Sequence, residues 1–244
     1  STIWYPTVLT FGAVSLAFIG LNDVSDAALA SNKVFTLIVV LAIYWIATFI
    51  ALKGLNWVGK ISKIGGIVGT VIPAALLIVL GAIYIFSGGH NNMDMSQGFF
   101  PDLTKLDNLV LASSIFLFYA GMEMMGVHVM DVNNPSRNYP KAIIIGSLAT
   151  VCIFVMGTFA LGFIIPAKDI NLTQSLLIGF DNYFRHFHIG WAGPIIAVAL
   201  MFGVLASVLT WVAGPSKGIF TVGKAGYLPP FFQKTNAQGV QRNI

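Results

Sequence analysis

The sequence predicts an all-α membrane protein with six transmembrane helices, and three observations support this fold class. First, 57% of its 244 residues are hydrophobic and only 9% are charged, whereas a soluble domain carries about 25% charged residues. Second, several apolar stretches reach the length of about 20 residues that crosses a bilayer. Third, the connecting segments alternate between rich and poor in Lys and Arg, as cytoplasmic and external loops do.

The apolar stretches are expected to be helices because a backbone in contact with lipid must satisfy its own hydrogen bonds. Five of the six contain no charged residue, and the fourth contains one, Glu123. Pro73, in the middle of the third stretch, predicts a kink that neighbouring helices compensate. Residues 1–216 would form the transmembrane bundle. The predicted spans are residues 1–21, 34–52, 64–88, 108–130, 142–167 and 190–216.

Lys and Arg are unevenly distributed between the two sets of loops. If the spans alternate in direction, nine of the 13 basic residues lie on one side and four on the other. Cytoplasmic loops are enriched in Lys and Arg, so we place loops 53–63 and 131–141 and the tail 217–244 in the cytoplasm. The tail is either a short interfacial helix ending at Pro229-Pro230 or a plain connector. The external loops would be 22–33, 90–107 and 168–189.

The basic residues form short clusters between apolar runs, with no continuous patch along the sequence. This distribution argues against a nucleic-acid partner and leaves the lipid bilayer as the expected surrounding. The single cysteine, Cys152, lies in an apolar run and is expected to serve packing. His186 and His188 lack a third ligand at usable spacing for zinc. Because no paired carboxylates, nucleophile elbow or metal cluster occurs, we expect neither an enzyme nor a cofactor.

Glu123 is the ionisable residue that lies deep within a predicted span. Such groups are costly in hydrocarbon and usually line a cavity or a pathway. Gly121 and Gly126 flank it and lower helix propensity, and interrupted helices expose backbone groups to substrates in secondary transporters. The alternative is a structural carboxylate, or one that reaches the membrane edge, because only seven residues separate Glu123 from Met130. We favour the site-lining interpretation.

Ser207 and Trp211 lie four residues apart near the end of the last span, so they share one helical face. A Trp near a helix end is more often an interfacial residue than a gate. Ser207 and Thr210, with the small residues Gly203 and Ala206, suit either helix packing or the wall of a polar cavity. The residues alone favour packing.

Three motifs, in order, are similar to those of a known transporter family. Residues 131–140, Asp-Val-Asn-Asn-Pro-Ser-Arg-Asn-Tyr-Pro, resemble an acidic-x-x-Asn-Pro-x-Arg-x-x-Pro loop. Residues 119–123, Tyr-Ala-Gly-Met-Glu, resemble an aromatic-x-Gly-x-Glu helix break, and residues 211–218 with 228–232 resemble an eighth helix and the segment after it. These are motifs of the amino acid–polyamine–organocation (APC) superfamily. Within it, the chain most resembles bacterial glutamate/γ-aminobutyrate antiporters.

The resemblance implies an inverted-repeat, LeuT-like fold in a bacterial inner membrane, with the chain as a fragment that matches helices three to eight. Both ends look cut, which agrees with a fragment. Ser207 occupies a position where the glutamate/γ-aminobutyrate antiporters carry an acidic residue, so glutamate specificity is not secured by the resemblance. The substrate-binding residues it implies are Tyr119, Ala120, Gly121, Met122, Glu123, Ser207 and Trp211.

The function that the resemblance implies is secondary active amino-acid transport by alternating access. We expect antiport of an amino acid against its decarboxylated product, as in glutamate/γ-aminobutyrate exchange and acid resistance. One alternative is an amino-acid symporter of the same superfamily that takes protons as a second partner, which is consistent with Ser207. Another, of a different class, is a non-transporting membrane scaffold subunit.

Overall fold

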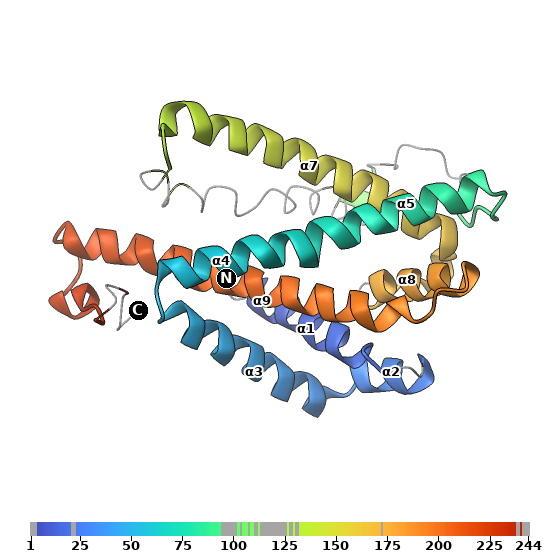
Figure 1. Cartoon of the computed structure of the whole chain (residues 1–244), viewed down its shortest axis with the longest axis horizontal. Helices are drawn as coiled ribbons and strands as arrows, with labels where there is room; N and C mark the ends of the chain where they lie inside the picture. Colours follow the sequence, from blue (N-terminus) through green and yellow to red (C-terminus); the bar gives the residue numbers. More distant parts are fainter. Residues whose placement is uncertain are drawn as a thin grey trace.

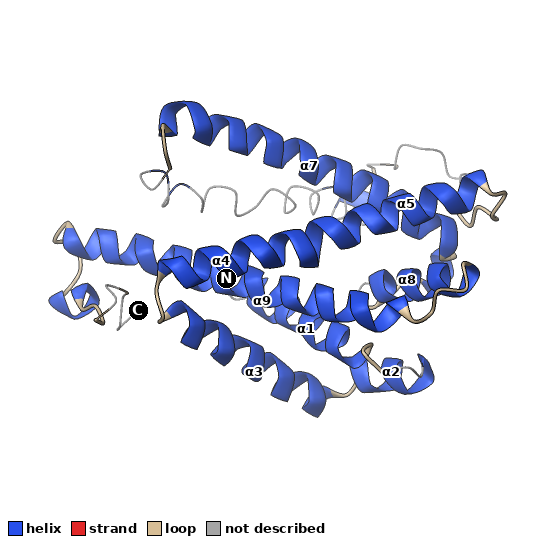
Figure 2. Cartoon of the chain, viewed as in Figure 1, coloured by secondary structure: helices blue, strands red, loops and turns tan. Residues whose placement is uncertain are grey.

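The computed structural model describes residues 4–20, 23–93, 102, 104–106, 108–109, 112, 126, 129, 132–171, 173–237 and 240. Within these residues the chain forms helices joined by turns and contains no β-strand (Figure 2). The all-α fold class is therefore confirmed for the part of the chain that is described.

The helices vary widely in length, from one turn to 33 residues. The chain forms α1 (Trp4–Ala17), α2 (Asp23–Ala30), α3 (Lys33–Ala51), α4 (Leu55–Gly66), a π-helical turn η1 (Ile67–Val71), α5 (Ile72–Phe86), α7 (Pro135–Ile164), a 3₁₀ turn η4 (Ala167–Asp169), α8 (Ser175–His186), α9 (Ala192–Lys224) and a 3₁₀ turn η5 (Pro230–Gln233).

Four of the described helices are long and apolar enough to cross a membrane: Lys33–Ala51, Asn56–Phe86, Pro135–Ile164 and Ala192–Lys224. They correspond to the second, third, fifth and sixth predicted spans. The helix within the first predicted span, α1, has 14 residues, fewer than the about 20 that cross a bilayer. The fourth predicted span, 108–130, lies almost entirely outside the described residues.

The helices continue beyond the apolar stretches at one end of the bundle. α4 begins at Leu55 and continues through η1 into α5, α7 begins at Pro135, and α9 continues to Lys224. Pro135 occupies the first turn of its helix, where the missing N–H has no intrahelical acceptor. A helix can extend beyond the hydrocarbon of the membrane. Charged residues therefore mark where the apolar span ends, while the backbone remains helical. The tail thus starts as a continuation of α9.

The connecting segments gather at two opposite ends of the bundle (Figure 1). At one end, Asn236 Nδ2 donates a hydrogen bond of 2.8 Å to Leu52 O, which joins the C-terminal segment to the α3–α4 turn. At the other end, Gln174 Nε2 and Ser31 Oγ lie 3.5 Å apart, between the segment before α8 and the end of α2. This grouping is what alternating spans require.

α9 lies at the centre and packs against α1, α3, α4 and η1. Two clusters of buried apolar residues surround it, one including Phe180, Tyr183 and Phe184 of α8 and the other including Ala47 of α3 and Val208 of α9. The outward faces of α3, α5 and α7 carry many exposed large apolar side chains. Apolar surface of that extent fits contact with lipid or further membrane helices.

The closest helix crossing brings η1 against α9 at two glycines. A Cβ added to Gly69 would lie 2.5 Å from Ala199 O, and one added to Gly203 would lie 2.6 Å from Gly69 O. Gly65, one turn earlier, lies against Ala206. Small residues at this spacing let two membrane helices approach backbone to backbone. The crossing fixes η1 beside the middle of α9.

Candidate functional site

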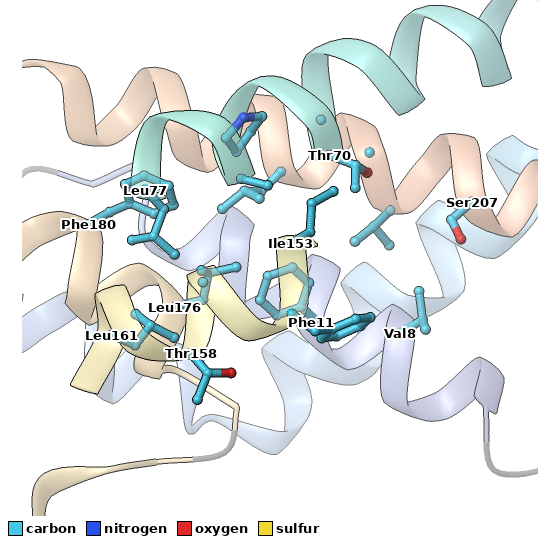
Figure 3. Close-up of a pocket in the computed structure, with 18 residues that line it drawn as sticks. Val8, Phe11, Thr70, Leu77, Ile153, Thr158, Leu161, Leu176, Phe180 and Ser207 are labelled. Carbon is cyan, nitrogen blue, oxygen red and sulfur yellow. The ribbon is translucent and has the colours of Figure 1, made fainter. Parts of the chain in front are cut away.

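A cavity of about 460 Å³ opens between α1, η1, α5, α7, α8 and α9. Its volume falls within the about 300–1,000 Å³ typical of small-molecule sites. The described residues that line it are Val8, Phe11, Gly69, Thr70, Pro73, Ala74, Leu77, Ile153, Phe154, Gly157, Thr158, Leu161, Leu176, Phe180, Leu200, Gly203, Val204 and Ser207. Ten of these side chains are labelled in Figure 3, where Ser207 and Phe180 lie at opposite ends.

The described part of the cavity wall is apolar except for three hydroxyl groups, from Ser207, Thr70 and Thr158. These residues come from α9, η1 and α7 respectively, so the polar groups are distributed around the cavity and do not form one patch (Figure 3). A few placed polar groups in an apolar wall are what orients a small ligand. The described wall has no charged side chain.

The wall formed by η1 has an origin that can be traced to Pro73. In an α-helix the N–H of residue 73 would donate to the carbonyl of Gly69, but proline has no N–H. The chain instead forms a π-helical turn in which the N–H of Ile72 donates to Ile67 O, five residues back. Such turns occur frequently at functional sites. The structure thus has a change of hydrogen-bond register just before Pro73, and Thr70 of this turn lies on the cavity wall.

The structure brings Ser207 to the cavity but does not bring Trp211 to it. The ring centroid of Trp211 lies 4.6 Å from that of Trp4, and Tyr5 Oη donates a hydrogen bond of 2.9 Å to Trp211 O. Tyr5 in turn contacts Tyr44, with centroids 6.2 Å apart. Trp211 thus belongs to an aromatic cluster with Trp4, Tyr5 and Tyr44.

Thr210, next to Trp211, takes part in helix packing. Its Oγ1 lies 2.8 Å from Ser62 Oγ on α4 and donates to Ala206 O at 2.9 Å. The polar residues at the end of α9 therefore divide into two sets. Ser207 faces the cavity, whereas Thr210 joins α9 to α4.

The remaining five predicted site residues are Tyr119, Ala120, Gly121, Met122 and Glu123, and they lie outside the described residues. The helix break at this position and the role of its carboxylate stay predictions. In the part of the chain that is described, no three His, Cys, Asp or Glu side chains are grouped so as to hold a metal ion. His186 packs its ring against Tyr84 and Phe187, with centroids 4.9 Å away in both cases.

Sequence reasoning missed most of the cavity wall. It concentrated on one ionisable residue and on α9, whereas the wall also comes from Phe11 of α1, Thr70 of η1 and Thr158 of α7. A hydroxyl in an apolar helix has no distinctive pattern, because Ser and Thr occur commonly at packed helix interfaces. Apart from Ser207 and Gly203 of α9, Pro73 was the signal that pointed to this region.

The comparison with known proteins extends over nearly the whole chain. The model of the amino acid permease family matches residues 1–243. A glutamate/γ-aminobutyrate antiporter of Lactococcus lactis subsp. lactis is 33% identical over 98% of this chain and 47% of its own length. An uncharacterized transporter of Legionella pneumophila is 31% identical over 98% of this chain and 50% of its own length.

More distant relatives carry other substrates in their names. A cadaverine/lysine antiporter of Escherichia coli is 21% identical over 94% of this chain and 48% of its own length. The chain thus spans about half the length of the curated relatives it matches. These relatives are transporters and antiporters, so the protein is not an enzyme. With apolar helices that can cross a bilayer and a family match over residues 1–243, the chain belongs to the amino acid permease family of the APC superfamily.

Proposed function

We propose that the whole protein is a secondary active amino-acid antiporter of the glutamate/γ-aminobutyrate type that works by alternating access. The observation that carries the proposal is the cavity in the bundle, apolar with three hydroxyls and bordered by Ser207. Its size suits a ligand as small as an amino acid or amine. The similarity to a glutamate/γ-aminobutyrate antiporter, 33% over 98% of the chain, supports the same activity.

In this proposal, residues 119–123 form a helix break whose backbone groups meet the α-amino group of the substrate. Glu123 gates the cytoplasmic side, and Ser207 faces the substrate path. Trp211 lines the inner exit, a place consistent with its aromatic cluster with Trp4 and Tyr5. Interrupted membrane helices bind substrates in this way because their unpaired backbone groups point into a cavity.

We further propose six spans in a partial LeuT-like inverted repeat, with 108–130 as the fourth. Loops 53–63 and 131–141 and the tail 217–244 would face the cytoplasm of a bacterium, across its inner membrane. The grouping of the α3–α4 turn with the C-terminal segment supports a shared side for two of these three. The excess of Lys and Arg in all three supports the cytoplasm as that side.

A proton-coupled amino-acid symporter is the second candidate, and Ser207 is the observation that favours it. A hydroxyl in place of a carboxylate leaves the described wall of the cavity without charge. Charge beside a dry site discriminates strongly between ionised and neutral substrates. The substrate selectivity of this protein can therefore differ from that of its glutamate-exchanging relatives.

The test uses the full-length protein in proteoliposomes. We expect labelled glutamate to enter only when an amino acid or amine counter-substrate is inside, and to do so without a pH gradient. Accumulation driven by an imposed pH gradient with an empty lumen would replace antiport by symport. No uptake under either condition, with every natural amino acid tested, would favour the scaffold alternative.

A matched pair of variants tests the site itself. Ser207→Phe fills the cavity, and we expect it to lower exchange at least tenfold. Leu205→Phe adds a ring to the same helix at a residue outside the described cavity lining, and we expect it to retain exchange. Equal activity of the two variants would remove the cavity from the transport path.

A further inference from the structure

One end of the bundle carries a surface of exposed basic and aromatic side chains. It is built from three chain segments that are far apart in sequence: the α3–α4 turn with the start of α4, the end of α9, and the segment that follows α9. We call it the basic end surface. It comprises Lys53, Trp57, Lys60, Lys224 and Lys234, all of which are exposed.

A hydrogen bond between two segments far apart in sequence brings Lys53 and Lys234 to the same end of the bundle. Asn236 Nδ2 donates to Leu52 O at 2.8 Å, across 184 positions of sequence. Lys53 directly follows Leu52, and Lys234 lies two residues before Asn236. In Figure 1 the C-terminal segment accordingly lies beside the turn between α3 and α4.

The end of α9 and the start of α4 extend the same surface. Gln233 Nε2 donates a hydrogen bond of 3.0 Å to Gly223 O, next to Lys224. On α4, Lys60 follows Trp57 by three residues, so the two share a helical face. The lysines therefore line one end of the bundle from α9 across to α4.

The two sequence segments that carry these lysines contain no Asp or Glu. Residues 48–64 and 211–237 include Lys63 and Lys217 besides the four lysines named above, and neither segment has an Asp or a Glu. The positive charges of the exposed residues Lys53, Lys60, Lys224 and Lys234 repel one another and attract anions. A partner rich in negative charge would stabilise this end.

Exposed aromatic side chains indicate where this end of the bundle lies relative to the membrane. Trp57, Tyr227 and Phe231 are 54%, 82% and 56% exposed. Lys53 Nζ lies 5.8 Å from the Trp57 ring centroid, so the positive charge and the aromatic ring lie next to each other. Rings of Trp and Tyr concentrate at the level of lipid headgroups. The surface also begins directly after the apolar helix α3, which ends at Ala51.

We propose that the basic end surface binds the phosphate headgroups of anionic phospholipids in the leaflet that borders it. Lysines beside a transmembrane helix are attracted to anionic lipids, by about fivefold in affinity for each charge. Exposed rings next to apolar spans would lie in the membrane, which favours lipid over a nucleic acid or an acidic protein segment. The site is independent of the substrate that the protein transports.

The test is native mass spectrometry of the full-length protein purified with phosphatidylglycerol or phosphatidylcholine. We expect phosphatidylglycerol to be retained in preference, and the preference to fall at high salt. Replacement of Lys53, Lys60 and Lys234 together by Gln should weaken phosphatidylglycerol binding about a hundredfold, the product of three fivefold effects. The same three positions changed to Arg should retain it.

A charge-matched variant at the opposite end serves as the control. It replaces three exposed lysines by Gln: Lys33, Lys105 and Lys168. We expect this variant to bind phosphatidylglycerol like the wild type. Equal retention of the two lipids by the wild type, an equal loss in both Gln variants, or stronger binding of an oligonucleotide than of phosphatidylglycerol would each overturn the proposal. If the first Gln variant does not fold, the Arg variant and the salt dependence of the wild type decide.

Discussion

The two clusters of buried apolar residues in the helix bundle differ in the size of their fully buried side chains. In the half that contains α8, the fully buried side chains include the large rings Phe180, Tyr183 and Phe184. We call this the aromatic half. In the half nearer the α3–α4 turn, the buried cluster holds no aromatic residue, and its members are Leu9, Ala13, Val39, Ile43, Ala47, Ala51, Val58, Val204, Val208 and Leu209. We call this the small-residue half.

The difference explains how a tightly packed helix bundle can contain a cavity. In the aromatic half, rings from the short helix α8 occupy the volume between longer helices. In the small-residue half, helix backbones approach one another directly, as Gly69 and Gly203 do. The cavity lies where the two modes meet, since its wall includes Phe180 of the first cluster and Val204 of the second. Neither mode fills that junction.

The largest effect is expected from removal of a ring in the aromatic half. Phe184 is 1% exposed, and Phe184→Ala should destabilise the protein by about 3 kcal/mol, through lost contacts and the cavity left behind. Val208, 0% exposed in the small-residue half, should cost about 1 kcal/mol as Val208→Ala because less volume is removed. Unfolding in mixed micelles titrated with SDS measures both. Equal losses would contradict the contrast between the halves.

A smaller loss, of about 2 kcal/mol, is expected for Gly203→Ala. The added Cβ would lie 2.6 Å from Gly69 O, so the backbones of η1 and α9 must separate. Gly193 is the matched control on the same helix, because no atom lies within 4 Å of its added Cβ. Gly193→Ala should be neutral or slightly stabilising, since alanine favours helix. The same SDS titration applies, and a neutral Gly203→Ala would disprove the close crossing.

Removal of the hydrogen bond between α4 and α9 should have a modest effect. Thr210→Val deletes the hydroxyl that lies 2.8 Å from Ser62 Oγ, and hydrogen bonds between membrane helices contribute about 0.6 kcal/mol on average. A double-mutant cycle with Ser62→Ala isolates that term. A coupling energy of zero would show that steric packing alone joins the two helices.

The smallest expected effect is a pH dependence in the aromatic half. Burial, and then the negative charge of Asp26, raise the pKa of Asp181 on α8 above its ordinary value, even though Arg185 Nε lies 2.9 Å from its carboxylate. Folding therefore favours the protonated carboxyl. This stabilisation is fully present below the unfolded pKa, near 3.8, and is lost as pH rises through the higher folded pKa.

Thermal unfolding between pH 4 and pH 7 measures this term. The wild type should gain melting temperature as the solution is acidified, relative to Asp181→Asn, which has no proton to bind at this position. The difference should be small because the Asp181 side chain is 35% exposed. A wild type that gains no more than Asp181→Asn would show that Asp181 has an ordinary pKa.

The long spans were predictable from sequence because the membrane selects them by composition alone. Residues 34–52 and α3 (Lys33–Ala51) nearly coincide. α8 was placed in an external loop, because a 12-residue helix that includes Asp181 and Arg185 is too short and too charged to be recognised as a span. Its burial comes from tertiary packing of Phe180 and its neighbours, which no local pattern encodes.

The candidate site was predictable only in part. Ser207 and Trp211 share one helical face, yet Ser207 lines the cavity and Trp211 packs on Trp4. The spacing of two residues along a helix determines the face on which their side chains lie. What each side chain contacts on that face depends on how α1 crosses α9. Pro73 predicted only a kink in the third span, whereas the π-helical turn before it and the position of Thr70 on the cavity wall depend on the structure.

The bond from Asn236 to Leu52 O has a mechanical consequence. It links the segment that follows α9 to the turn that joins α3 and α4, and Gln233 fixes that same segment to α9 at Gly223. A tilt of α9 would therefore pull on both α3 and α4. The two hydrogen bonds therefore favour joint displacement of these three helices over independent movement of α9.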